Sequence, residues 1–77
     1  LTITEINYNE TDSRVTLTWN SNPGRTYSIF SSFDLLDFAN EVADEVPAAG
    51  AGANSTSLTF PNPNPGSSRQ FFQVVEQ

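Results

Sequence analysis

Histidine, cysteine and lysine are all missing from this chain of 77 residues. Without histidine or cysteine there is no imidazole base, no thiolate nucleophile and no zinc site of the nitrogen and sulfur type. Without lysine there is no Schiff-base chemistry, and without cysteine no disulfide can stabilise the fold. Cysteine content leaves the redox compartment open, because exported and cytosolic domains can both lack it. We therefore expect a protein that is not an enzyme and uses no cofactor.

Positive charge is also scarce, because three arginines stand against nine acidic residues and give a net charge of −6. Such a chain repels phosphate groups, so we expect no nucleic-acid partner and no attraction to anionic lipid. No apolar run reaches the roughly 18–20 residues of a membrane-spanning helix, so we expect no membrane insertion. The sequence has no signal peptide and begins at Leu1 rather than at Met. We expect residues 1–77 to be a single domain cut from a longer protein.

Two alternating runs around a turn dominate the sequence. In the first run Val15, Leu17 and Trp19 share one face of a predicted strand, and threonines occupy the other face. Asn22-Pro23-Gly24 then favours a turn, because proline presets φ and glycine tolerates positive φ. Alternation resumes at Tyr27. This pattern predicts a β-hairpin over residues 15–32, with the rest of the chain covering its apolar face.

The remaining segments add further predicted strands. Residues 1–8 fit one strand if the register changes near Glu5, as it does at a β-bulge. Residues 57–60 form a short strand, and residues 70–76 are apolar on both faces, which predicts a central strand. Residues 33–39 lack alternation and predict one short helical turn that packs on the sheet. The fold class is all-β, a small antiparallel β-sandwich of five to six strands.

One spaced pattern is more specific than composition. Its positions are Leu17, Trp19, Ser21, Pro23, Gly24, Tyr27, Ile29, Ser32, Asp34, Leu35 and Phe38, and later Phe71, Phe72, Gln73 and Val74. The pattern resembles a small β-sandwich module of exported multidomain bacterial proteins, and more distantly an immunoglobulin-like domain of the fibronectin type III kind. The sequence departs from the module where Phe38 replaces a usual Trp and Gln73 a usual Arg. The resemblance implies a reduced sandwich, secreted or at the cell surface.

Oxygen-rich turns and leftover aromatic residues are the candidate binding groups. Glu10 and Asp12 are the weak candidate metal ligands, because calcium prefers carboxylate oxygens. No calcium-loop spacing is present, however, and a solvated turn is the simpler explanation. Phe30, Phe33 and Phe71 are the candidate ligand-binding residues, because the other aromatic residues are in phase with the core. Core packing is the simpler explanation for each of them.

Taken together, these patterns favour a non-catalytic accessory module, either a structural spacer or a protein-interaction domain. Its partners would be neighbouring domains of the parent protein or other proteins, reached through the open edges of its sheets. The alternative is a small carbohydrate-binding module that takes a polysaccharide.

Overall fold

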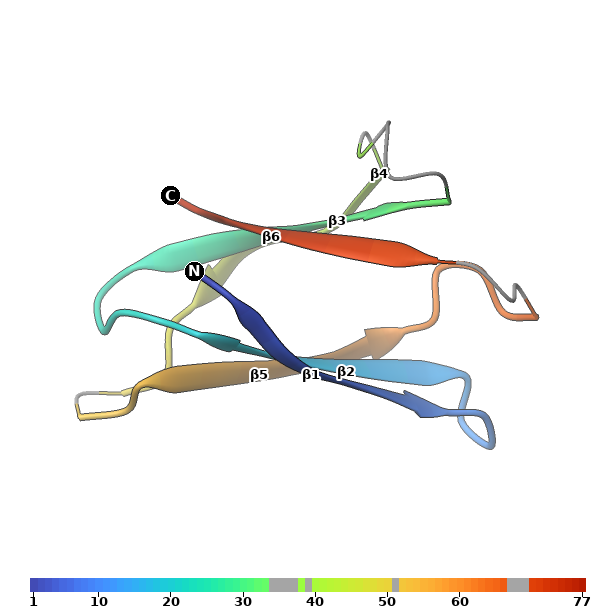
Figure 1. The fold of residues 1–77 in the computed structure, drawn as a ribbon, viewed down its shortest axis with the longest axis horizontal. Coiled ribbons are helices and arrows are strands. Elements are labelled where there is room, and N and C mark those ends of the chain that lie inside the picture. Colours follow the sequence, from blue (N-terminus) through green and yellow to red (C-terminus); the bar gives the residue numbers. More distant parts are fainter. Residues whose placement is uncertain (34–37, 39, 51, 67–69) are drawn as a thin grey trace.

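The protein is an antiparallel β-sandwich in the computed structural model, which describes residues 1–33, 38, 40–50, 52–66 and 70–77. The described residues form six strands, which agrees with the predicted β-sandwich of five to six strands, and these strands lie in two sheets of three. The first sheet has the order β1-β2-β5 and the second the order β4-β3-β6 (Figure 1). The strands are β1 (Ile3–Asn9), β2 (Arg14–Asn20), β3 (Thr26–Ser32), β4 (Asn40–Pro47), β5 (Ser55–Pro61) and β6 (Phe71–Glu76).

The core lies between the two middle strands, β2 and β3, whose buried apolar residues recur at alternate positions. Trp19 and Tyr27 are each fully buried, and their rings meet edge to face with 5.8 Å between centroids. Such an arrangement adds to the stabilisation that burial of the two rings already provides. The buried core residues are Val15, Leu17, Trp19, Tyr27, Ile29, Val46, Phe60 and Val74.

The two runs predicted as one hairpin are strands of opposite sheets, so that prediction is wrong. β2 pairs with β1 and β5, whereas β3 pairs with β4 and β6. The segment 21–25 crosses from one sheet to the other and contains a turn in which the Arg25 N–H donates to the Asn22 carbonyl. Alternation of apolar and polar residues determines which face of each strand is buried. Two strands in stacked sheets bury their apolar faces against each other, so they show the same alternation as the two strands of a hairpin.

The register change expected near Glu5 is confirmed. In the pairing of β1 with β2, the register shifts between Ile3 and Glu5. The shift lets Ile3 face the core opposite Trp19, while Ile6 faces the same side opposite Leu17. One extra residue therefore reconciles the two apolar phases of this strand.

The helical turn predicted for residues 33–39 lies largely outside the described residues. At its borders, Phe33 lies in a bend and is 52% exposed, and Phe38 is half-buried outside any strand. No helix in the described part of the chain is long and apolar enough to cross a membrane.

Candidate interaction surface

Strand β6 lies at an edge of the second sheet, which corrects the prediction of a central strand. β6 pairs with β3 on one side, and no other described strand lies beside it (Figure 1). Its register with β3 places Phe71, Gln73 and Val75 on the outer face, because Val74 between them packs in the core. The apolar residues that predicted a buried strand thus include Val75, which is 40% exposed.

One hydrogen bond shows which backbone groups of β6 face the open edge. The N–H of Gln77 donates to the carbonyl of Thr26 at 2.8 Å, so Gln77 points its backbone groups toward β3. Backbone groups point alternately to the two sides of a strand. Gln73 and Val75 therefore also bond to β3, and Phe72 and Val74 present their N–H and C=O groups to the open edge.

The other three sheet edges carry features that discourage pairing with a further strand. β1 has the register shift near Glu5, and β4 has two register shifts and ends at Pro47. β5 is regular but ends at Pro61 and has serine and threonine on its outer face. Bulges and prolines protect sheet edges against unwanted pairing. Among the edges formed by the described residues, only β6 has neither a bulge nor a proline.

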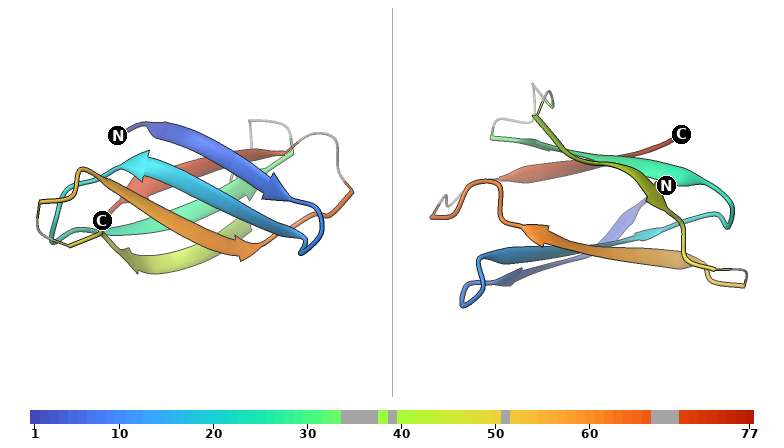
Figure 2. Two further views of the ribbon diagram at one scale, coloured as in Figure 1. Left: turned by 90° about the horizontal axis from the view of Figure 1, so that it is seen from below. Right: turned by 180° about the vertical axis from the view of Figure 1, so that it is seen from behind.

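Exposed apolar side chains gather on the same side of the sandwich as β6. Figure 1 shows β1 and β6 nearest the viewer, and the rear view in Figure 2 brings β4 and β5 forward. On β1, Ile6 and Tyr8 face the second sheet opposite Leu17 and Val15, yet they are 44% and 49% exposed. Ile6 and Tyr8 therefore leave the border of the sandwich between β1 and β6 incompletely covered, and we call this border the β1–β6 side.

Two carboxylates fix the C-terminal end of β6 to its surroundings. Glu76 accepts hydrogen bonds from the Asn22 side-chain amide at 3.0 Å and from the Tyr27 hydroxyl at 2.8 Å. These donors, the amide first, lower the pKa of Glu76, while burial raises the pKa of Tyr27. The Tyr27 hydroxyl also accepts from the backbone N–H of Asn22, which ties the 21–25 segment to β6.

The second carboxylate is Asp44 on β4. The Ser28 hydroxyl donates to it at 2.6 Å, and this bond is the main reason why the pKa of Asp44 is lowered. The side-chain amide of Gln77 bonds both Ser28 and Asp44, so the network joins β3 and β4 to the residue that follows β6. Hydrogen bonds to the charged form of a carboxyl group stabilise that form.

We expect acid to destabilise the fold through these two groups. Because the folded-state pKa values of Asp44 and Glu76 lie below their ordinary values, the unfolded chain binds protons more readily. Their contribution is complete above the ordinary carboxyl pKa of about 4 and is lost as the pH falls through the lower folded values. Melting temperatures between about pH 7 and pH 3 should therefore decrease toward acid.

The matched control carries Asp44→Asn and Glu76→Gln together. These changes keep the size of both side chains but remove the titration, so the acid dependence of the variant should be clearly flatter. If the variant and the parent lost the same stability toward acid, the two networks would not be the cause.

The three aromatic residues predicted to bind ligand lie on or near the outer face of the second sheet. Phe30 pairs with Gln73 and Phe71 with Ser32, so the two rings are diagonal neighbours across β3 and β6. Both are half-buried, and Phe33 follows directly after β3 with 52% exposure. The structure therefore places Phe30 and Phe71 on one face of the second sheet, and Phe33 follows β3 at the same end of that sheet.

The candidate metal ligands, Glu10 and Asp12, both lie in the turn between β1 and β2, but their carboxylates have different neighbours. The Asp12 carboxylate accepts from the Asn9 side-chain amide at 3.3 Å, and Asn9 Oδ1 in turn accepts from the backbone of Thr11 and Asp12. Glu10 lines a separate hollow. Within the described ranges, no three His, Cys, Asp or Glu residues lie close enough together to hold a metal ion.

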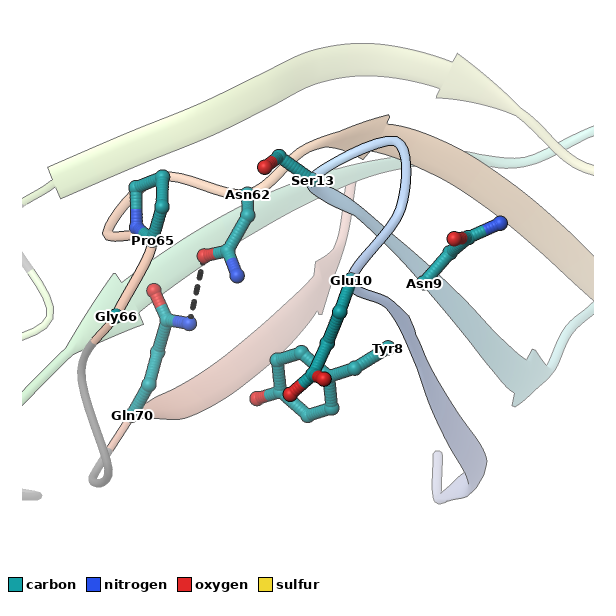
Figure 3. A pocket seen from close by; sticks show the side chains of 8 residues that line it. All are labelled: Tyr8, Asn9, Glu10, Ser13, Asn62, Pro65, Gly66 and Gln70. Atoms are coloured by element: carbon teal, nitrogen blue, oxygen red, sulfur yellow. Dashed lines mark hydrogen bonds between the residues drawn. The ribbon is translucent and has the colours of Figure 1, made fainter.

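That hollow, of about 660 Å³, opens between the β1–β2 turn and the segment after β5 (Figure 3). The Tyr8 ring and the Glu10 carboxylate lie on one side, and Asn62 and Gln70 on the other. Asn62 Oδ1 accepts from the Gln70 side-chain amide at 3.0 Å, which fixes these two side chains. Sequence reasoning missed this site, because its two sides come from opposite ends of the chain. The sequence indicated only that Tyr8 lies on the same face of its strand as Ile6, and it gave no sign of the other residues of the hollow.

The chain was also compared with known proteins. No protein-family model, curated protein or solved structure matches it.

Proposed function

We propose that this chain is a non-catalytic accessory module of an exported or cell-surface bacterial protein, and that it binds other protein segments through the β6 edge. The observation that carries the proposal is that β6 is a regular edge strand with apolar residues on both faces. An added strand gains main-chain hydrogen bonds along such an edge and side-chain contacts at alternate positions. The spaced pattern around Trp19 supports the exported bacterial context.

The surroundings of β6 support binding rather than a purely passive spacer. A spacer needs only a stable fold, whereas at this edge no described residue bonds the outward backbone groups of Phe72 and Val74, and Val75 is exposed. Exposed edges without protection pair readily with other chains, so proteins generally block them. The irregular edges of β1 and β4 contrast with the regular β6, and this contrast supports β6 as the binding edge.

Hydrogen exchange tests the proposal. At a concentration where the isolated chain is a monomer, the amides of Phe72 and Val74 should exchange rapidly, and they should become protected when the same residues are part of the complete gene product. The amides of Gln73 and Val75, which bond to β3, serve as the internal control and should be protected in both. Rapid exchange of Phe72 and Val74 in the complete gene product would contradict a role for this edge.

A small carbohydrate-binding module is the second candidate, favoured by the hollow beside Tyr8. Sugars are bound by an exposed aromatic ring together with amide and carboxylate groups, and Tyr8, Asn62 and Glu10 provide these groups. Titration with cello-, chito- and xylo-oligosaccharides distinguishes the two candidates. Protein binding through β6 predicts no shifts in the aromatic signals. Saturable shifts of Tyr8, or of the Phe30, Phe33 and Phe71 group, would favour the carbohydrate function instead.

A further inference from the structure

We infer that the β6 edge pairs with the β6 edge of a second copy of this chain, antiparallel and about a two-fold axis at Gln73. The inference rests on the proposed function, because both use the β6 edge. It adds that the partner is a second copy of the same chain. The second sheets of the two copies would then join into one continuous sheet of six strands. A symmetric contact of this kind closes on itself as a dimer.

The face of each residue restricts the possible registers. Side chains directly opposite each other in an antiparallel pair lie on the same face of the sheet. Outer residues of β6 must therefore oppose outer residues of the second copy, and inner residues must oppose inner residues. A register centred on Gln73 satisfies this condition, since it places Gln73 opposite itself, Phe71 opposite Val75 and Phe72 opposite Val74.

The backbone groups fit the same register. Phe72 and Val74 are the residues whose N–H and C=O groups point to the open edge, as the bond from Gln77 to Thr26 requires. In this register Phe72 of one copy lies opposite Val74 of the other, so the two can exchange both N–H···O bonds. The two-fold axis repeats the pair. This register therefore uses the outward-pointing backbone groups of Phe72 and Val74.

The side chains also complement each other in this register. On the outer face an aromatic residue, Phe71, meets a β-branched residue, Val75, and the two Gln73 amides can bond to each other. Aromatic and β-branched residues are a favourable cross-strand pair. Glu76 is the only charged residue of β6, and it lies opposite an uncharged position, Gln70, rather than opposite itself. The strand therefore pairs with itself without opposing like charges.

The position of the edge adds apolar area to the contact. Ile6 and Tyr8 are exposed on the β1–β6 side, which is the side that a second copy would approach (Figure 1). The net charge of −6 acts against association, because two acidic copies repel each other. Salt screens that repulsion, so self-association should become stronger as the ionic strength rises.

Sedimentation velocity over a range of protein concentrations tests the inference. We expect a monomer–dimer equilibrium with a dissociation constant on the order of 100 µM, as for interfaces at the small end of the size range. Gln73→Glu places two carboxylates opposite each other on the axis and should weaken the dimer at least about tenfold. Gln73→Lys should do the same. An equimolar mixture of the two variants should associate again, because opposite charges then meet.

The matched control is Ser55→Glu, which adds the same charge on β5, at the opposite border of the sandwich. It should leave the dimer nearly unchanged. A parent chain that stays monomeric up to about 1 mM would overturn the inference, since the association would then be weaker than about −4 kcal/mol. A dimer that survives Gln73→Glu would also overturn it, because the contact would lie elsewhere. Neither result would overturn the proposed function, which depends on protection of Phe72 and Val74 in the complete gene product.

Discussion

Replacing Trp19 with alanine should remove about 3–5 kcal/mol of folding free energy, because the change empties the largest fully buried side-chain position. Trp19 lies on β2 and packs its ring against Tyr27 of the facing sheet. Domains of this kind have only about 5–15 kcal/mol of total stability, and a chain of this size lies toward the lower end. We therefore expect the variant to be largely unfolded at 37 °C.

Trp19→Phe is the matched control for this experiment. Among the described residues, the buried indole N–H of Trp19 has no hydrogen-bond partner, so phenylalanine removes an unpaired donor while it keeps most of the apolar volume. The control should thus lose much less stability than the alanine variant. Urea unfolding followed by circular dichroism measures both. Equal and small losses in the two variants would show that the two sheets do not pack through Trp19.

Proline substitutions in β6 should cost different amounts of stability at positions whose N–H groups point to the two sides of the strand. The N–H of Gln73 bonds to the carbonyl of Phe30, so Gln73→Pro removes that bond and leaves a carbonyl unpaired. Such a loss costs about 1–3 kcal/mol, and the rigid ring adds to it. The N–H of Glu76 points to the open edge, so Glu76→Pro removes no bond to β3.

Alanine variants separate the backbone effect from the side-chain effect. Gln73→Pro should be far less stable than Gln73→Ala, whereas Glu76→Pro should lose little more than Glu76→Ala. The second control is necessary because the Glu76 carboxylate bonds to Asn22 and Tyr27. Denaturant midpoints of the four variants give the comparison. Equal proline effects at both positions would mean that the open edge has been assigned to the wrong side of the strand.

Alternation in the sequence was sufficient to predict the class of fold and most of the core. Apolar residues recur at every second position before the turn, at Val15, Leu17 and Trp19, and after it, at Tyr27 and Ile29, and all of them are fully buried. The same alternation could not show that β2 and β3 belong to different sheets. Period-two patterning identifies the buried face of a strand, but hydrogen-bonded neighbours are chosen by contacts with strands far away in the sequence.

For the candidate surface too, the sequence indicated which residues are apolar but not which strands lie beside them. Apolar residues on both faces of 70–76 predicted a central strand, because a central strand usually meets other layers on both faces. The structure places β6 at an edge, where Val75 remains exposed. Which N–H groups face outward depends on the pairing of Gln77 with Thr26, and residues this far apart give no local signal of their contact. The hollow beside Tyr8 could not be predicted either, because its two sides come from segments far apart in the sequence.

Amide exchange along β6 tests most directly whether this edge is open. The measurement is residue-resolved hydrogen exchange by NMR, made at a concentration where sedimentation shows a monomer. An open edge predicts alternation, with rapid exchange at Phe72 and Val74 and slow exchange at Gln73 and Val75. Uniform protection along β6 in the monomer would show that both sides of the strand are already paired, and would contradict an open binding edge.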